Sequence, residues 1–137
     1  MMGGNAIRVG EQLGGVLSVF LQESFDGNVL YSADRQQNTR LNMFSLDGAF
    51  SESAVEGLPP ILHQGLWTVV PGGIYFVPVD APRSLRYFDF ATKKIRQIFE
   101  VPKNFSTGLS VSPGGDSILY SQADEDNTDI MLVDHFQ

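Results

Sequence analysis

The densest group of side chains that could bind a ligand is the acidic segment Asp124-Glu125-Asp126-Asn127-Thr128-Asp129, with four carboxylates in six residues. Carboxylate oxygens are hard ligands of the kind that calcium prefers. The segment lacks the glycine at the sixth position and the glutamate at the twelfth that complete an EF-hand loop. Short polar residues also suit an exposed turn. A turn is our main interpretation, and a calcium site is the alternative.

A serine nucleophile is the second chemistry to consider. Gly108-Leu109-Ser110-Val111-Ser112 nearly matches the G-x-S-x-G elbow of hydrolases, but its fifth residue is serine and it leads into a strand instead of a helix. The chain has no Cys, and its two His residues, His63 and His135, are isolated. Thiol nucleophiles, disulfides and thiolate zinc sites are therefore excluded. We expect no catalytic residue, no cofactor and no metal site, and hence no enzyme.

The charged residues are distributed unevenly along the chain. Nine Lys and Arg stand against 16 Asp and Glu, and the net charge of −7 disfavours binding to nucleic-acid phosphates. Basic residues could form a docking surface where they cluster, or they could simply occupy exposed edge strands and loops. Six of the nine fall in one segment: Arg83, Arg86, Lys93, Lys94, Arg96 and Lys103.

Length and composition predict one folded domain. The chain has 137 residues, 42% hydrophobic and 18% charged, which is enough apolar material for a core. No apolar run approaches the roughly 18 residues that span a membrane, and the first residues lack the pattern of a secretory signal. We expect a cytoplasmic protein that binds neither membranes nor nucleic acids.

Three apolar segments follow glycine-containing turns and define an internal repeat. Asp26-Gly27 precedes NVLYS, Gly72-Gly73 precedes IYFVPV, and Gly114-Gly115-Asp116 precedes SILYS. The aromatic residues of these segments are 45 and 44 residues apart: Tyr31, Phe76 and Tyr120. The apolar residues at the centre of the next segments are each 44 apart: Phe44, Phe88 and Leu132. Aromatic and β-branched residues between turn signals predict short strands.

A four-stranded unit of about 44 residues is the size of a β-propeller blade. We assign residues 15–58 to blade 1, residues 59–103 to blade 2, and residues 104–137 to blade 3, which lacks its fourth strand. The apolar segments are nearly continuous, so we expect neighbouring sheets to cover both faces of these strands. Trp67, in the first strand of blade 2, is expected to pack between blades, and ligand stacking near the central channel is the alternative.

The expected strands are short and follow one another in each blade. They are 17–22, 28–32, 39–46 and 50–55 in blade 1, 66–70, 74–77, 85–90 and 95–100 in blade 2, and 109–112, 118–122 and 129–133 in blade 3.

A spare strand, NAIRVGEQ, lies within residues 1–14, where Ile7 and Val9 alternate with polar residues. Three blades cannot close a ring, because closed propellers have roughly 4–8 blades. We expect a head-to-tail homodimer with a six-bladed ring, in which the spare strand of each copy pairs with residues 129–133 of the other. The alternative is that the sequence is a piece of a longer propeller.

The segment Gly108–Val133, GLSVSPGGDSILYSQADEDNTDIMLV, resembles the Ser-Pro-Asp-Gly repeat of TolB-like, or WD40-like, β-propellers. Ser112-Pro113-Gly114-Gly115 stands for that turn, with Gly in place of Asp. The turn is Ser24-Phe25-Asp26-Gly27 in blade 1 and Val70-Pro71-Gly72-Gly73 in blade 2. The resemblance covers about residues 25–136 and implies the propeller fold.

The end of the chain, from LRYFDFATKKIRQI onward, is also similar to the C-terminal blades of propellers fused to bacterial winged-helix regulators. The sequence contains no winged helix, so DNA binding is not implied.

Two functions remain open. The first is a non-enzymatic scaffold or protein-interaction module, with a second copy and an unidentified protein as partners. The second is a ligand-binding or enzymatic propeller with a site in the central channel. The first strands of the blades offer Trp67, Thr68, Ser110 and Ser112 to the channel, with no carboxylate or His. This composition favours the scaffold.

Overall fold

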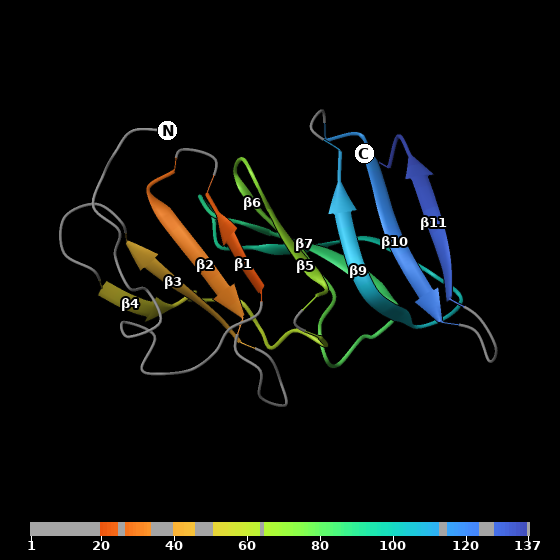
Figure 1. Cartoon of the computed structure of the whole chain (residues 1–137), viewed down its shortest axis with the longest axis horizontal. Helices are drawn as coiled ribbons and strands as arrows, with labels where there is room; N and C mark the ends of the chain where they lie inside the picture. Colours follow the sequence, from red (N-terminus) through yellow and green to blue (C-terminus); the bar gives the residue numbers. More distant parts are fainter. Residues whose placement is uncertain are drawn as a thin grey trace.

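The computed structural model describes residues 20–24, 27–33, 40–45, 51–63, 65–112, 115–123 and 128–136. These residues form three antiparallel sheets, which lie side by side in chain order (Figure 1). The predicted all-β class is confirmed. The described part of the chain contains no helix that could cross a membrane.

Each sheet is a meander in which consecutive strands pair. Blade 1 contains β1 (Phe20–Glu23), β2 (Val29–Ala33), β3 (Leu41–Ser45) and β4 (Ser51–Ala54). Blade 2 contains β5 (Trp67–Val70), β6 (Gly73–Phe76), β7 (Ser84–Asp89) and β8 (Ile95–Glu100). Blade 3 contains β9 (Phe105–Val111), β10 (Ser117–Ala123) and β11 (Thr128–Asp134). Every observed strand overlaps a predicted one, whereas the spare strand predicted within residues 1–14 lies outside the described residues.

The turn between the first two strands has the same hydrogen bonds in blades 1 and 3. The hydroxyl of Ser24 accepts a hydrogen bond from the amide of Val29, and the hydroxyl of Ser112 accepts one from the amide of Ser117, both at 3.1 Å. Gly27 and Gly115 follow with a φ of 77° in both turns, a conformation that glycine adopts without steric cost. The turn chemistry predicted from the repeat is therefore present in both blades.

The first strand of each blade lies innermost. Strand β5 contacts β1 on one side and β9 on the other, and β4, β8 and β11 are the outer strands of their sheets. This arrangement brings the first strands together as in a propeller, where they line the central channel.

The core lies between the blades, and blade 2 is its centre. All four residues of β6 are buried, because blades 1 and 3 cover its two faces. Trp67 is only 1% exposed, so the predicted packing between blades is confirmed. One core cluster joins Trp67 to Tyr31 of blade 1 and to Ile118 of blade 3.

The alignment of Tyr31, Phe76 and Tyr120 as equivalent residues is wrong. Tyr31 points forward to blade 2, where its ring stacks on that of Phe90, while Tyr120 points back toward Phe99 of blade 2. The residue equivalent to Tyr31 is Tyr75, whose ring contacts that of Phe136, two residues after the last strand of blade 3. Successive side chains of a strand point to opposite faces, so a slip of one residue exchanges the two faces.

The expectation that both faces of the strands are covered holds for blade 2 but not for blade 3. On the face of blade 3 turned away from blade 2, Leu119 is 45% exposed, Ile130 78% and Leu132 59%. Leu132 is also not equivalent to Phe44 and Phe88, which are both 1% exposed.

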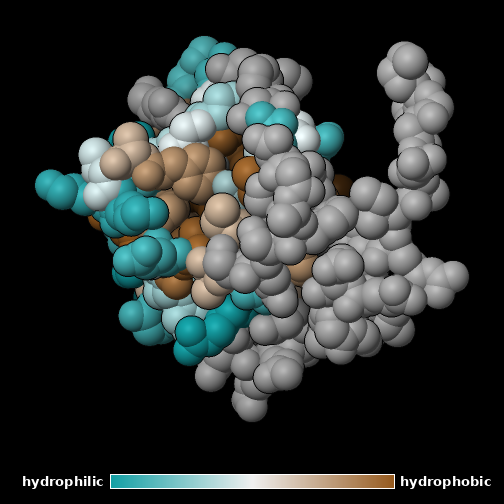
Figure 2. Space-filling model, turned by 90° about the vertical axis from the view of Figure 1, so that its left-hand side faces the viewer, coloured by the Kyte–Doolittle hydropathy of each residue, from teal (hydrophilic) through white to brown (hydrophobic). Residues whose placement is uncertain are grey.

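The opposite end of the array differs from blade 3. Phe44 lies on the face of blade 1 turned away from blade 2, since it alternates with Met43, which packs against the shared core. Phe44 is nevertheless only 1% exposed, unlike the residues on the outward face of blade 3. In the view from the blade 1 side, hydrophilic residues rim the described surface and apolar residues show between them (Figure 2).

Candidate functional site

The side chain of Gln22 in β1 joins the innermost strands of blades 1 and 2 by hydrogen bonds. Its Nε2 donates a hydrogen bond to the carbonyl oxygen of Trp67 at 3.0 Å, and its Oε1 accepts one from the amide of Val69 at 2.8 Å. The hydroxyl of Thr68 also donates to Oε1, at 3.3 Å. The side chain therefore continues the hydrogen bonding of β5 into the neighbouring blade.

The four residues expected to face the channel lie in four different environments. Thr68 is bound to Gln22, Ser110 is exposed on β9, and Ser112 belongs to the turn after β9. Trp67 is buried in the core. The expectation of no carboxylate in these strands needs correction, because β1 extends to Glu23, whose side chain is exposed.

Ser110, the serine at the centre of the elbow-like sequence, lies within a strand. Gly108, Leu109, Ser110 and Val111 all belong to β9, and the chain turns from there into β10 instead of a helix. Of the two His residues, His63 lies in the link between blades 1 and 2, and His135 follows β11. Within the described residues, no group of three His, Asp or Glu could hold a metal ion.

The acidic segment lies mostly outside the described residues, which include only Thr128 and Asp129 of its six. These two residues begin β11, and Asp129 is exposed. The segment thus joins β10 to β11, the position of a turn, and the choice between turn and calcium site stays open.

The basic residues predicted as a possible docking surface lie on the outer half of blade 2. Arg86 is in β7, Arg96 is in the outer strand β8, and Lys93 and Lys94 are in the turn between these strands. Arg96 lies over the ring of Tyr87, 5.3 Å from its centroid. This is the predicted edge location, and docking stays a prediction.

Two tyrosine hydroxyls have altered acidity. Burial raises the pKa of Tyr120. Burial also raises the pKa of Tyr87, as does the nearby charge of Asp89, while Arg96 acts in the opposite direction.

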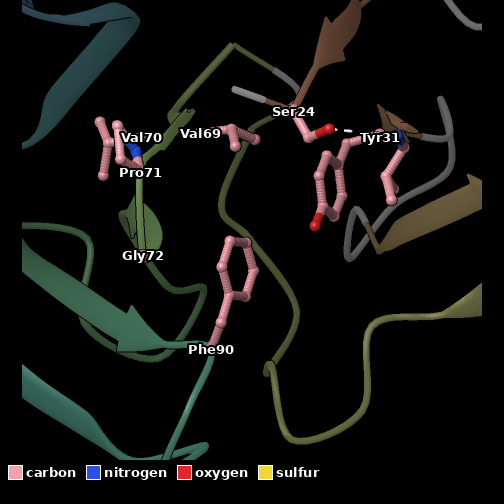
Figure 3. A pocket seen from close by; sticks show the side chains of 8 residues that line it. Ser24, Tyr31, Val69, Val70, Pro71, Gly72 and Phe90 are labelled. Carbon is pink, nitrogen blue, oxygen red and sulfur yellow. Dashed lines mark hydrogen bonds between the residues drawn. The ribbon is translucent and has the colours of Figure 1, made fainter. Parts of the chain in front are cut away.

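A pocket of about 340 Å³ lies between blades 1 and 2, at the end of the sheets that carries the turns after their first strands. Tyr31 from β2 and Phe90 from the turn after β7 face the same space, opposite Val69, Val70 and Pro71 (Figure 3). The rings of Tyr31 and Phe90 are almost parallel, with centroids 5.9 Å apart. Ser24, Val29 and Gly72 also line the pocket.

Sequence reasoning did not find this pocket. The available signal was the departure of blade 2 from the repeated turn, where Val70 replaces the serine found at Ser24 and Ser112. The missing information was which residue of blade 1 the turn would meet.

Comparison with solved structures identifies the architecture. The chain is similar to TolB from Acinetobacter baumannii (TM-score 0.65, 13% identity, covering 88% of this chain and 30% of that one). It is also similar to a candidate TolB from Agrobacterium tumefaciens (TM-score 0.62, 16% identity, covering 88% of this chain and 47% of that one). A third match is a chain of a nidogen/laminin complex (TM-score 0.58, 14% identity, covering 87% and 44%).

At such low sequence identities, the structural similarity establishes the fold but not a family or a function. The chain spans less than half the length of each of the three structures. No family model and no curated protein matches the sequence. The stacked meander sheets and the structural matches together show that this chain is built of β-propeller blades resembling those of TolB.

Proposed function

We propose that the protein is a non-enzymatic scaffold whose blades assemble with further blades into a closed propeller. One observation carries the proposal, the exposed apolar face of blade 3 formed by Leu119, Ile130 and Leu132. We call these three residues the outer face of blade 3. Apolar side chains exposed together in this way are typical of surfaces that bind a partner.

The position of this face within the repeat indicates what would cover it. Leu119 is the equivalent of Tyr31 and Tyr75, because each lies in the second strand of its blade on the side away from the preceding blade. Tyr31 contacts blade 2, and Tyr75 contacts Phe136. A further blade on the outer face would repeat this contact.

The partner that we propose is a second copy of the chain. Strand β11 is an edge of its sheet in the described part of the chain, so its outer backbone groups could pair with another strand. The segment NAIRVGEQ of a second copy would supply that strand, and two copies would complete a six-bladed ring in head-to-tail fashion. The exposed edge and the exposed outer face both support this arrangement.

Charge gives the assembly a distinctive dependence on salt. Residues 104–137 hold six acidic residues and no basic one, and residues 15–58 hold six acidic and two basic residues. The ring would bring these two acidic segments together, so their repulsion should weaken the dimer at low salt and screening should strengthen it.

Light scattering after size-exclusion chromatography tests the proposal. The wild-type protein should have a mass near twice 15.1 kDa, with a larger dimer fraction at high salt. The double variant Ile130→Glu and Leu132→Glu should be a folded monomer. The matched control is Ile95→Glu, which changes an exposed isoleucine of blade 2 outside the outer face and should remain dimeric. A well-folded wild-type monomer would overturn the proposal.

The alternative function is a ligand-binding or enzymatic propeller with its site at the channel. Its support is a structural match to oligogalacturonate lyase in complex with manganese, at 14% identity and a TM-score of 0.59. Against it, the hydroxyl of Thr68 is already bound to Gln22. An ion or small molecule found on the ring axis of the assembled protein would favour this alternative.

A further inference from the structure

We propose that the pocket between blades 1 and 2 binds a single uncharged aromatic ring. The inference is independent of the proposed assembly, since every residue that it uses belongs to one chain. The ring could belong to a free small molecule or to a side chain of a bound peptide.

The lining of the pocket selects for an apolar, planar occupant. Val29, Val69, Val70 and Pro71 supply aliphatic surface, and Tyr31 and Phe90 supply aromatic rings. Among the described residues that line the pocket, none carries a charge, so these residues would offer a charged group no ion pair in return for its lost hydration. The volume of about 340 Å³ is at the small end of the range for ligand sites and limits the occupant to one ring system.

Hydrogen bonds already hold the walls of the pocket in place. The hydroxyl of Ser24 accepts a hydrogen bond from the amide of Val29, which the dashed line in Figure 3 marks. The amide of Phe90 donates to the carbonyl oxygen of Gly72 at 2.9 Å, which joins two turns of blade 2. A pocket held in this way needs little reorganisation to bind, and preorganisation raises affinity.

The corresponding place between blades 2 and 3 has a different chemistry. Val69 and Val111 are equivalent, because each pairs with the isoleucine that begins the apolar segment of the next strand. At the two neighbouring positions, Ser112 replaces Val70 and His135 replaces Phe90. Phe136 contacts Tyr75, the equivalent of Tyr31, at this second junction, so the two junctions differ in the polar Ser112 and His135 and the second provides a matched control.

Binding of indole, followed by saturation-transfer NMR, tests the inference. We expect saturable binding with a Kd on the order of 1 mM, as befits so small a ligand, and binding of benzoate at least about tenfold weaker because of its charge. Val69→Phe fills the pocket and should weaken indole binding at least about tenfold. Val111→Phe makes the same change at the other junction and should leave binding unchanged.

The two sources of the ring are separated by a second probe, N-acetyl-tryptophanamide, which carries the indole ring on a capped peptide unit. Affinity equal to or greater than that of indole indicates a peptide side chain, and loss of affinity indicates a free small molecule. If Val69→Phe does not fold, Phe90→Ala replaces it, because it removes one aromatic wall. Absence of saturable indole binding, or equal binding by wild type and the pocket variants, would overturn the inference.

Discussion

The side chain of Gln22 accepts a hydrogen bond from the backbone amide of Val69 at 2.8 Å and so joins two blades. The two residues are 47 apart in sequence, and the contact exists only when β1 and β5 lie side by side. The same side chain donates to the carbonyl oxygen of Trp67. A single glutamine thus satisfies two backbone groups of the next blade.

Replacing Gln22 should destabilise the contact between these blades. Gln22→Met keeps the length of the side chain but leaves the amide of Val69 and the carbonyl of Trp67 without this partner, which should cost about 1–3 kcal/mol. Urea denaturation measures the loss. Thr68→Val, which removes only the hydroxyl donor to Gln22, should cost less, and an equal loss in both variants would contradict our account.

Gly73 is required for close packing, not for its backbone conformation. A Cβ at this position would collide with the carbonyl oxygen of Phe88 and the ring of Tyr87. Gly73→Ala should therefore lower the free energy of unfolding by about 1–3 kcal/mol or more, as overpacking does. The control is Gly108→Ala, whose Cβ would meet, among the described residues, the flexible side chain of Ser121, at 3.3 Å for its hydroxyl oxygen. Its stability should stay within about 1 kcal/mol of wild type.

Stability should fall in the alkaline range because burial raises the pKa of Tyr120. The folded protein holds this proton more tightly than the unfolded chain, so the stabilisation is complete below the unfolded pKa of about 10 and is lost as pH rises through the folded pKa. Unfolding free energies measured at increasing pH should fall less in Tyr120→Phe than in wild type. Identical pH profiles would show that the hydroxyl is not desolvated.

The acidic segment should not bind calcium tightly. Isothermal titration should show no saturable binding at micromolar concentrations, because the segment lacks the EF-hand glycine and glutamate. The melting temperature should be the same with and without chelator. A site with a Kd below about 100 µM, within the range of known calcium sites, would reverse the interpretation as a turn.

Removal of the N-terminal segment should weaken the proposed dimer. Deletion of Met1–Glu11 takes away most of the strand that we expect each copy to give to β11 of the other, so both interfaces lose it. Sedimentation analysis should show a larger rise in the dimer dissociation constant than Ile95→Glu causes. An unchanged constant would show that the segment does not take part.

The sequence determined those features that depend on local chemistry. The turns at Ser24 and Ser112 form as the repeat predicted, since a serine side chain can bind the backbone a few residues away without help from the rest of the fold. Strand positions followed from runs of aromatic and β-branched residues in the same way. The β-propeller architecture was predictable because the pattern recurs about every 44 residues.

Tertiary structure decided which face each side chain occupies and what it meets there. Tyr31 and Tyr120 look equivalent along the sequence, yet their side chains point to opposite faces of their blades. An alignment of repeats that is uncertain by one residue cannot predict the face, because successive side chains of a strand alternate between the two faces. Tyr31 and Phe90 line one pocket although 59 residues separate them in the chain. Such a contact depends on how two sheets stack, and that stacking is set by packing of the whole core instead of by any local pattern.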